Sequence, residues 1–190
     1  IGSGCFRNAG QICTATERVL VHKSVHDRFV EGLVKAAGQV RMGDPFDPAT
    51  NMGPLNNAVA MSKMQSHMDD AAARKAEVLT GGKVASGLPT NLYFEPTVVT
   101  GLTPDSLLNQ EESFGPVAPV LTFETDEEAL QLAATSPYGL SAAVFTNTIK
   151  KAFFFTERLR VGIVNVNEMS CYWEPHIPAG GAAGTQSGLG

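Results

Sequence analysis

The sequence alternates short β-branched runs with longer segments of helical periodicity, and this alternation constrains the fold more than any other feature. Strands are predicted at residues 18–22, 77–80, 94–100, 119–123, 141–145 and 162–166. Helices are predicted from Ser24 onward and over residues 57–75, 125–134 and 148–160. A helix between two strands is long enough to act as the crossover connection that joins parallel strands. The pattern therefore predicts an α/β fold, with a mostly parallel twisted sheet and helices on both faces.

Three local signals refine this prediction. Thr125 followed by Glu128 is typical of a capping box at the start of a helix, and Asn147 is a candidate cap for the helix over 148–160. The run 141–145 is apolar enough to indicate a buried strand. From Met169 onward the composition becomes aromatic, then rich in proline and glycine, which predicts an irregular surface segment.

Charge and cysteine content exclude several classes of function. The chain has 190 residues, with 14 Lys+Arg against 19 Asp+Glu and a net charge of −5. Without a basic run there is no footprint for nucleic acid or for an anionic membrane surface, and no apolar stretch approaches the ~18 residues of a membrane span. Three cysteines indicate free thiols in a reducing compartment, so we expect a cytoplasmic protein. The histidines and cysteines lack metal-ligand spacing, and no metal is predicted.

The two ends of the sequence are also informative. The chain opens at Ile1 without a visible signal peptide and closes in a glycine-rich stretch. We therefore expect it to be a piece of a longer protein.

Cys13 is the first candidate for chemistry. It follows a polar, glycine-containing segment and precedes a predicted strand, a junction that can present a thiol in a cleft where backbone N–H groups lower its pKa. The alternative is a small buried hydrophobe, since free cysteine is among the most buried residue types. Cys5 and Cys171 lack such a setting, and core or incidental roles are expected for them.

The second candidate is the run Glu111-Glu112-Ser113-Phe114-Gly115-Pro116. A carboxylate at this constrained bend could accept two hydroxyl hydrogen bonds from a sugar, and the ring could pack beside a flat heterocycle. The pattern alone favours the simpler interpretation, a solvated acidic pair before an ordinary turn.

Taken together, the motifs resemble the C-terminal catalytic part of the NAD(P)-dependent aldehyde dehydrogenase superfamily. The run Phe6–Cys13 followed by Arg18-Val19 resembles the active-site cysteine signature of that family, and the run 111–117 resembles a second motif. Further matches in the same order are Gly43-Asp44-Pro45, Gly53-Pro54, residues 137–141 and residues 162–167. The resemblance covers essentially the whole chain.

This resemblance implies a function and roles for individual residues. The Cys13 thiolate would attack an aldehyde to give a thiohemiacetal, hydride would pass to NAD or NADP, and water would hydrolyse the resulting thioester. The backbone N–H of Cys13 would donate to the oxyanion. Glu112 would hydrogen-bond the nicotinamide ribose, and Phe114 would pack near the nicotinamide. The partner is a small-molecule aldehyde, and a homo-oligomer is expected for the full-length protein.

The sequence departs from the family pattern in two ways. The nucleotide-binding domain precedes this segment in the family, and with it the general-base glutamate and the oxyanion asparagine. The resemblance thus implies a partial catalytic domain over 1–172, an irregular glycine-rich tail over 173–190 near the active-site mouth, and an isolated piece that does not turn over. The chain also has Pro178-Ala179-Gly180-Gly181 where the family usually has Pro-Phe-Gly-Gly, which would open one wall of the aldehyde pocket. Tyr172 and Trp173 could line the same mouth or serve packing.

Two other classes of function stay open. One is a thiol hydrolase that pairs Cys13 with a histidine such as His176. The other is a non-catalytic structural or interaction module. Removing a covering domain would expose apolar surface, so self-association of this piece is expected.

Overall fold

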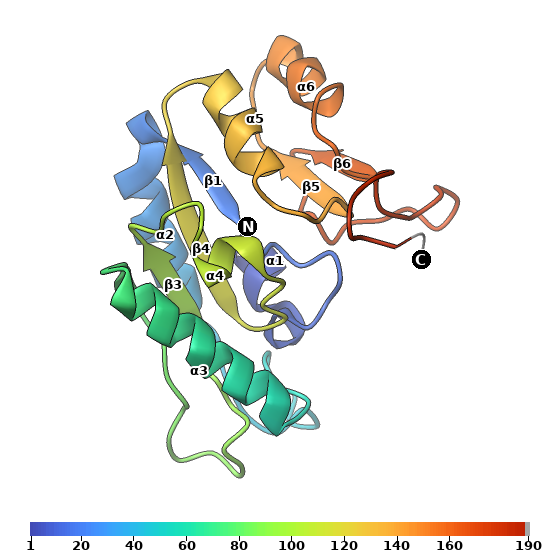
Figure 1. Cartoon of the computed structure of the whole chain (residues 1–190). Helices are drawn as coiled ribbons and strands as arrows, with labels where there is room; N and C mark the ends of the chain where they lie inside the picture. The colour runs from blue at the N-terminus through green and yellow to red at the C-terminus, as the bar shows by residue number, and fades with distance from the viewer. Residues whose placement is uncertain (189–190) are drawn as a thin grey trace.

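The computed structural model describes residues 1–188 and contains two β-sheets (Figure 1). The larger sheet has the strand order β1-β4-β3-β2, and the smaller one pairs β5 with β6. The strands are β1 (Val19–His22), β2 (Glu77–Thr80), β3 (Thr97–Thr100), β4 (Val117–Phe123), β5 (Ser141–Val144) and β6 (Ile163–Val166). The α-helices are α1 (Gly2–Phe6), α2 (His26–Gly38), α3 (Ala58–Ala73), α4 (Leu107–Gln110), α5 (Asp126–Ala134) and α6 (Ile149–Thr156), with 3-10 turns η1 (Arg7–Gly10) and η2 (Lys23–Val25).

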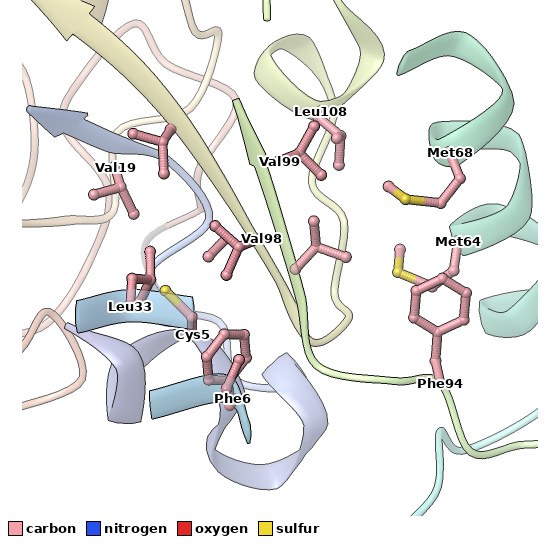
Figure 2. Close-up of a cluster of buried hydrophobic side chains, with 14 of the residues drawn as sticks. Cys5, Phe6, Val19, Leu33, Met64, Met68, Phe94, Val98, Val99 and Leu108 are labelled. Carbon is pink, nitrogen blue, oxygen red and sulfur yellow. The ribbon is translucent and has the colours of Figure 1, made fainter. Parts of the chain in front are cut away.

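Helices cover the two faces of the larger sheet. Adjacent side chains of a strand point to opposite faces, and Figure 2 shows Val98 directed toward Leu33 of α2 while Val99 lies toward Leu108 of α4. The side chains of Met64 and Met68 on α3 approach from that second side. The predicted α/β fold with a mostly parallel sheet is therefore confirmed.

Two details of the sheet differ from the simplest form of the prediction. Strand β2 pairs with β3 in the antiparallel sense, whereas β1·β4, β3·β4 and β5·β6 are parallel. The segment between β2 and β3 contains no helix that would act as a crossover, so the chain returns in the opposite direction. Strands β5 and β6 form a sheet of their own.

The structure confirms one predicted cap and corrects another. The Thr125 side chain accepts the Glu128 N–H at 3.1 Å and caps α5. Asn147 does not cap α6, which begins at Ile149 after Thr148 and ends at Thr156 rather than near residue 160. A local turn in which the Thr148 N–H donates to Thr146 Oγ1 precedes the helix, and it leaves Asn147 one position too early.

The strand β5 is predicted to be buried, but all four of its residues are only half-buried within the described chain. Two short helices, α1 and α4, were not predicted. α1 has the sequence Gly-Ser-Gly-Cys-Phe, which has low helix propensity, and packing of the buried Cys5 and Phe6 stabilises it. Among residues 1–188, no helix combines the length and apolarity needed to cross a bilayer.

Candidate active site

Cys13 is exposed and lies in the loop between η1 and β1. The turn before it is unusual because Asn8, Ala9 and Gly10 have successive φ angles of 53°, 54° and 72°. Residues other than glycine rarely occupy this left-handed region, and such strain persists only where surrounding contacts impose it. The loop that presents Cys13 is therefore held by contacts with the rest of the fold.

The Gln11 side chain provides two of these contacts and one bond within the loop. Its amide nitrogen donates to the carbonyl oxygens of Asn8 at 3.1 Å and Pro54 at 3.2 Å, and its amide oxygen accepts the Asn56 N–H at 2.8 Å. The amide thus uses both donor and acceptor groups. Gln11 ties the cysteine loop to the Gly53-Pro54 segment, a motif that lies more than 40 residues away.

The cysteine loop also packs directly on the 111–117 segment. A Cβ added at Gly10 would lie 2.0 Å from the carbonyl oxygen of Gly115, so only glycine permits this approach. The Glu17 carboxylate accepts the Ser113 N–H at 2.6 Å and the Phe114 N–H at 2.8 Å. Burial raises the pKa of Glu17 to about 7, against the lowering effect of those two N–H donors. Two motifs that are a hundred residues apart in sequence therefore share one site.

Glu112 and Phe114 lie on the exposed side of this second segment. Glu112 is exposed, and the Phe114 ring is 36% exposed with a backbone φ of 52°. Phe114 lines an open cavity of about 590 Å³ together with Asn8, Gln11, Pro54 and four other residues; neither Cys13 nor Glu112 belongs to its lining. Both side chains are therefore accessible from outside this segment.

A third segment, which contains Ser170 and Cys171, holds the residues that follow Cys13 in place. The Ser170 hydroxyl donates to the Thr14 carbonyl at 2.8 Å and lies 2.8 Å from Thr16 Oγ1. The Cys171 thiol also contacts the Thr14 carbonyl at 3.2 Å. Asn165 of β6 donates to the carbonyl of Met169, which holds this segment against the second sheet. The second sheet is thereby connected to the cysteine loop.

The three thiols have different environments. Cys5 is 1% exposed, and burial raises its pKa to about 12, so its thiol stays protonated. Cys171 is half-buried against a carbonyl, and Cys13 alone is exposed. The core or incidental roles expected for Cys5 and Cys171 agree with these environments.

The structure brings some of the predicted residues together and leaves others apart. The loops that carry Cys13, Glu112 and Phe114 are in contact. His176 is exposed, and its charged neighbour is Glu174 at 4.0 Å; within residues 1–188 no hydrogen bond joins His176 to Cys13. The part of the chain that the structure describes contains no group of three His, Cys, Asp or Glu residues able to hold a metal ion.

The tail over 173–190 is irregular in its described part, and residues 189–190 lie outside the described chain. Backbone and side-chain bonds attach it to the loop before β5: the N–H of Ala182 donates to Gly139 O at 2.9 Å, and Gly139 N–H donates to the Ser187 hydroxyl at 3.0 Å.

Sequence reasoning missed the roles of Gln11 and Glu17. Gln11 belongs to the Phe6–Cys13 motif, which does not by itself indicate the role of this side chain. For Glu17 the available signal was a carboxylate placed two positions before β1, where an unpartnered charge is costly.

Comparison with known proteins agrees with this geometry. The model of the family described as "Aldehyde dehydrogenase family" matches residues 1–190. The chain is 41% identical over 187 residues to mitochondrial succinate-semialdehyde dehydrogenase from Rattus norvegicus, covering 97% of this chain and 35% of that protein. It is 38% identical over 185 residues to the mitochondrial enzyme of the same name from Arabidopsis thaliana, covering 97% of this chain and 34% of that one.

Solved structures share the fold. Succinate-semialdehyde dehydrogenase from Burkholderia pseudomallei superposes with a TM-score of 0.91 at 36% identity, covering 99% of this chain and 38% of that one. Betaine aldehyde dehydrogenase from Staphylococcus aureus, in complex with NAD+, gives 0.90 at 39% identity, covering 94% and 36%. The chain spans about a third of the length of the curated relatives. With the cysteine loop, the 111–117 segment and the whole-length match in agreement, this chain belongs to the aldehyde dehydrogenase family.

Proposed function

We propose that this chain is the C-terminal catalytic portion of an NAD(P)-dependent aldehyde dehydrogenase, with Cys13 as its nucleophile. The observation that carries the proposal is an exposed thiol in a loop that is fixed from three sides, by Gln11, by Glu17 and by Ser170. A nucleophile benefits from such fixation because catalysis depends on holding the reacting atoms in one geometry.

The chemistry starts at the Cys13 sulfur. Its thiolate adds to the aldehyde carbonyl, forming an S–C bond and placing negative charge on the oxygen. Among residues 1–188 no acceptor binds the backbone N–H of Cys13, so this N–H is free to donate to the oxyanion. After oxidation the substrate carbon stays bonded to Sγ as a thioester, and water releases the carboxylic acid and regenerates the thiol.

The same portion of the chain contributes to cofactor binding. Bound NAD(P)+ supplies the hydride acceptor for the oxidation. The exposed Glu112 carboxylate would accept hydrogen bonds from the ribose hydroxyls, and the accessible face of the Phe114 ring would pack near the nicotinamide. The remaining contacts, the general base and the second oxyanion donor would come from the part of the protein that precedes residue 1.

Relatives guide the choice of substrate class without fixing the aldehyde. The relatives named above act, by their names, on succinate semialdehyde and betaine aldehyde. We propose a small-molecule aldehyde, and we keep as predictions a homo-oligomer, a catalytic domain over 1–172 and a cytoplasmic location, noting that the rat and Arabidopsis relatives are mitochondrial.

The decisive experiment uses the full-length protein that contains this chain. Aldehyde-dependent reduction of NAD(P)+ is measured for the wild type, for Cys13→Ser and for Cys171→Ser as a matched control. We expect Cys13→Ser to lower kcat at least about a thousandfold, as loss of a covalent nucleophile does, and Cys171→Ser to retain most of the activity. A Cys13→Ser variant with near-normal turnover would exclude Cys13 as the nucleophile.

The thiol-hydrolase alternative needs its own measurement, because an aldehyde dehydrogenase nucleophile can also cleave activated esters. Ester hydrolysis without NAD(P)+ is compared in wild type and His176→Ala. An unchanged rate is expected, since His176 is exposed and has Glu174 as its charged neighbour. A large loss of rate would favour the hydrolase.

A further inference from the structure

The Glu17 carboxylate makes a long-range polar contact within the site. One of its oxygens accepts the Ser113 N–H at 2.6 Å, and the other accepts the Phe114 N–H at 2.8 Å. Two successive N–H groups that converge on one anion are the arrangement of a backbone anion-binding nest. In this molecule the anion is a side chain from the cysteine loop.

This contact requires a carboxylate. Above its raised pKa of about 7 Glu17 is ionised, and an ionised carboxylate only accepts hydrogen bonds, so each of its oxygens takes one N–H. A glutamine at this position would have the same shape but only one acceptor, and its NH₂ group would face one of the two N–H donors. Ser113 is 2% exposed, so water could not easily replace a lost partner at its N–H.

The loop that receives these bonds is tightly constrained. Phe114 has a φ of 52°, in the left-handed region where non-glycine residues are strained. A Cβ added to the next residue, Gly115, would lie 2.1 Å from Met64 Sδ, so the loop is pressed against α3. The Ser113 hydroxyl is also 3.4 Å from His67 Nδ1 of the same helix. Glu17 holds the backbone from one side while α3 supports it from the other.

The charges around Glu17 are mixed, and burial is the largest influence on its pKa. Burial disfavours the charged form of Glu17, and the neighbouring Glu112 raises its pKa further, whereas Lys63 lowers it. The largest effects that lower the pKa of Glu17, and so favour its charged form, are the hydrogen bonds from the Phe114 and Ser113 N–H groups. The hydrogen bonds of the Glu17 side chain therefore go to the backbone of the Glu112–Phe114 segment.

We propose that Glu17 is a positioning residue that fixes the backbone of the Glu112–Phe114 segment, and that it thereby sets the orientation of the cofactor-facing Glu112 carboxylate and Phe114 ring. The orientation toward a cofactor rests on the proposed function. The fixation of the backbone does not, because it concerns two hydrogen bonds within this chain.

The test compares Glu17→Gln with Glu17→Asp and with the surface control Glu31→Gln in the full-length protein. Hydrogen exchange of the Ser113 and Phe114 amides is measured first. In Glu17→Gln we expect protection of these two amides to fall at least about tenfold, since charge-assisted bonds are lost, while the amides of β4 keep theirs. Glu17→Asp retains both acceptors on a shorter stem and should show an intermediate loss. Glu31→Gln should change neither.

Cofactor binding is measured second, by calorimetry of NAD(P)+ without aldehyde and by steady-state kinetics. Glu17→Gln should weaken binding and raise the KM for NAD(P)+ about tenfold, with a smaller change in kcat and partial recovery in Glu17→Asp. Unchanged protection in Glu17→Gln, or a loss of protection spread over β4 as well, would overturn the fixation. Lost protection with unchanged NAD(P)+ affinity would overturn the positioning role. A wild type that binds no NAD(P)+ would overturn the proposed function, and the exchange result would still report on the fixation.

Discussion

The two sheets are built from similar residues but are buried to very different extents. In the larger sheet, Val98 and Val99 of β3 and Ala118 of β4 are 0% exposed. In the smaller sheet every residue of β5 is half-buried, and Val166 of β6 is 40% exposed. Both contain parallel pairs of Val- and Ala-rich strands. The two sheets differ in how completely other elements pack on their faces, because a parallel sheet is stable only when helices or other layers bury those faces.

The larger sheet obtains this cover from within the chain. α2 packs on one face, and α3 with α4 packs on the other (Figure 2). In the smaller sheet, α6 lies beside β6 (Figure 1), and Ala152 is its only buried residue among those described. The first region, which is the larger sheet with α1–α4, folds around its own core, whereas the second region, which is the smaller sheet with α5 and α6, leaves apolar side chains exposed.

The largest expected effect tests this contrast directly. Val98→Ala removes two methyl groups from a fully buried site and should lower the free energy of unfolding by about 2–3 kcal/mol, from ~0.8 kcal/mol per buried CH₂ plus the cavity that remains. Val164→Ala makes the same change in half-buried β6 and should cost less than about 1 kcal/mol. Urea denaturation of both variants measures the difference. Equal costs would mean that the two sheets are equally well packed.

The next effect concerns the connection between the two regions. The Arg18 guanidinium donates to the carbonyls of Leu132 at 3.1 Å and Ala133 at 3.0 Å, in the last turn of α5. Arg18→Ala removes both bonds and should cost about 2 kcal/mol, since the partners are partly buried carbonyls bonded to a charge. Arg18→Lys should recover only part of this stability, because an ammonium group lacks the planar pair of N–H donors with which a guanidinium bonds two carbonyls at once.

Hydrogen exchange locates the effect of Arg18→Ala. The chain runs from α5 into β5, so exchange should accelerate in α5 and in the smaller sheet while β3 keeps its protection. Acceleration in β3 equal to that in β5 would contradict the description of the first region as independent.

A smaller effect is expected from the titration of Glu17 in the first region. The folded chain holds this proton up to a pKa of about 7, whereas the unfolded chain releases it near 4.5. The unfolded state therefore binds fewer protons in this window, and the Glu17 contribution to stability falls as pH rises from about 4.5 to about 7. Because Glu17 is partly exposed, a decrease on the order of 1–2 kcal/mol is expected.

Other groups titrate in the same window, so the measurement must be a difference. Burial lowers the pKa of His67 in the folded chain. The folded state therefore loses stability as the pH falls below 6.5, the pKa of this histidine in the unfolded chain. Around Glu17 itself, Glu112, Lys63 and Arg18 are the charged neighbours. Subtracting the curve of Glu17→Gln from that of the wild type cancels the shared groups. A difference that stays flat between pH 4.5 and 7 would show that Glu17 keeps an ordinary pKa.

The fold was predictable from sequence where local signals agree with the packing. The strand at Val19–His22 and the helix at Ala58–Ala73 follow from β-branched runs and from helix propensity, and the Thr125 cap follows from a four-residue motif. α1 was not predictable, because its glycine-rich sequence is helical only through the burial of its last residues. The half-buried state of β5 depends on which other elements pack against it, and the residues of the strand itself do not specify this.

The same distinction applies to the site. Cys13, Glu112 and Phe114 were found because each belongs to a contiguous motif. Glu17 and Gln11 act on partners 97 and 45 residues away, respectively, and no local pattern reports such a pairing. Glu17 precedes β1 and Phe114 precedes β4, and these two residues meet because β1 and β4 pair side by side. A sequence pattern does not specify this pairing.

The smallest effect on stability concerns the apolar surface of the second region. Ile149 and Phe153 are 74% and 58% exposed and lie one turn apart on α6, and Ile149 lines a shallow cavity with Val166. We expect this surface to drive self-association of the 190-residue chain, since exposed contiguous apolar area favours contact between copies.

The double variant Ile149→Ser/Phe153→Ser should change the free energy of unfolding by less than about 0.5 kcal/mol, because both side chains already contact water. It should nevertheless shift the chain toward the monomer in sedimentation velocity across a concentration series. Phe46→Ser is the matched control: Phe46 is 96% exposed but stands on a loop of the first region. If Phe46→Ser reduces association as much as the double variant, general surface hydrophobicity is responsible. If only the double variant does so, the exposed apolar side chains of α6 in the second region drive the association.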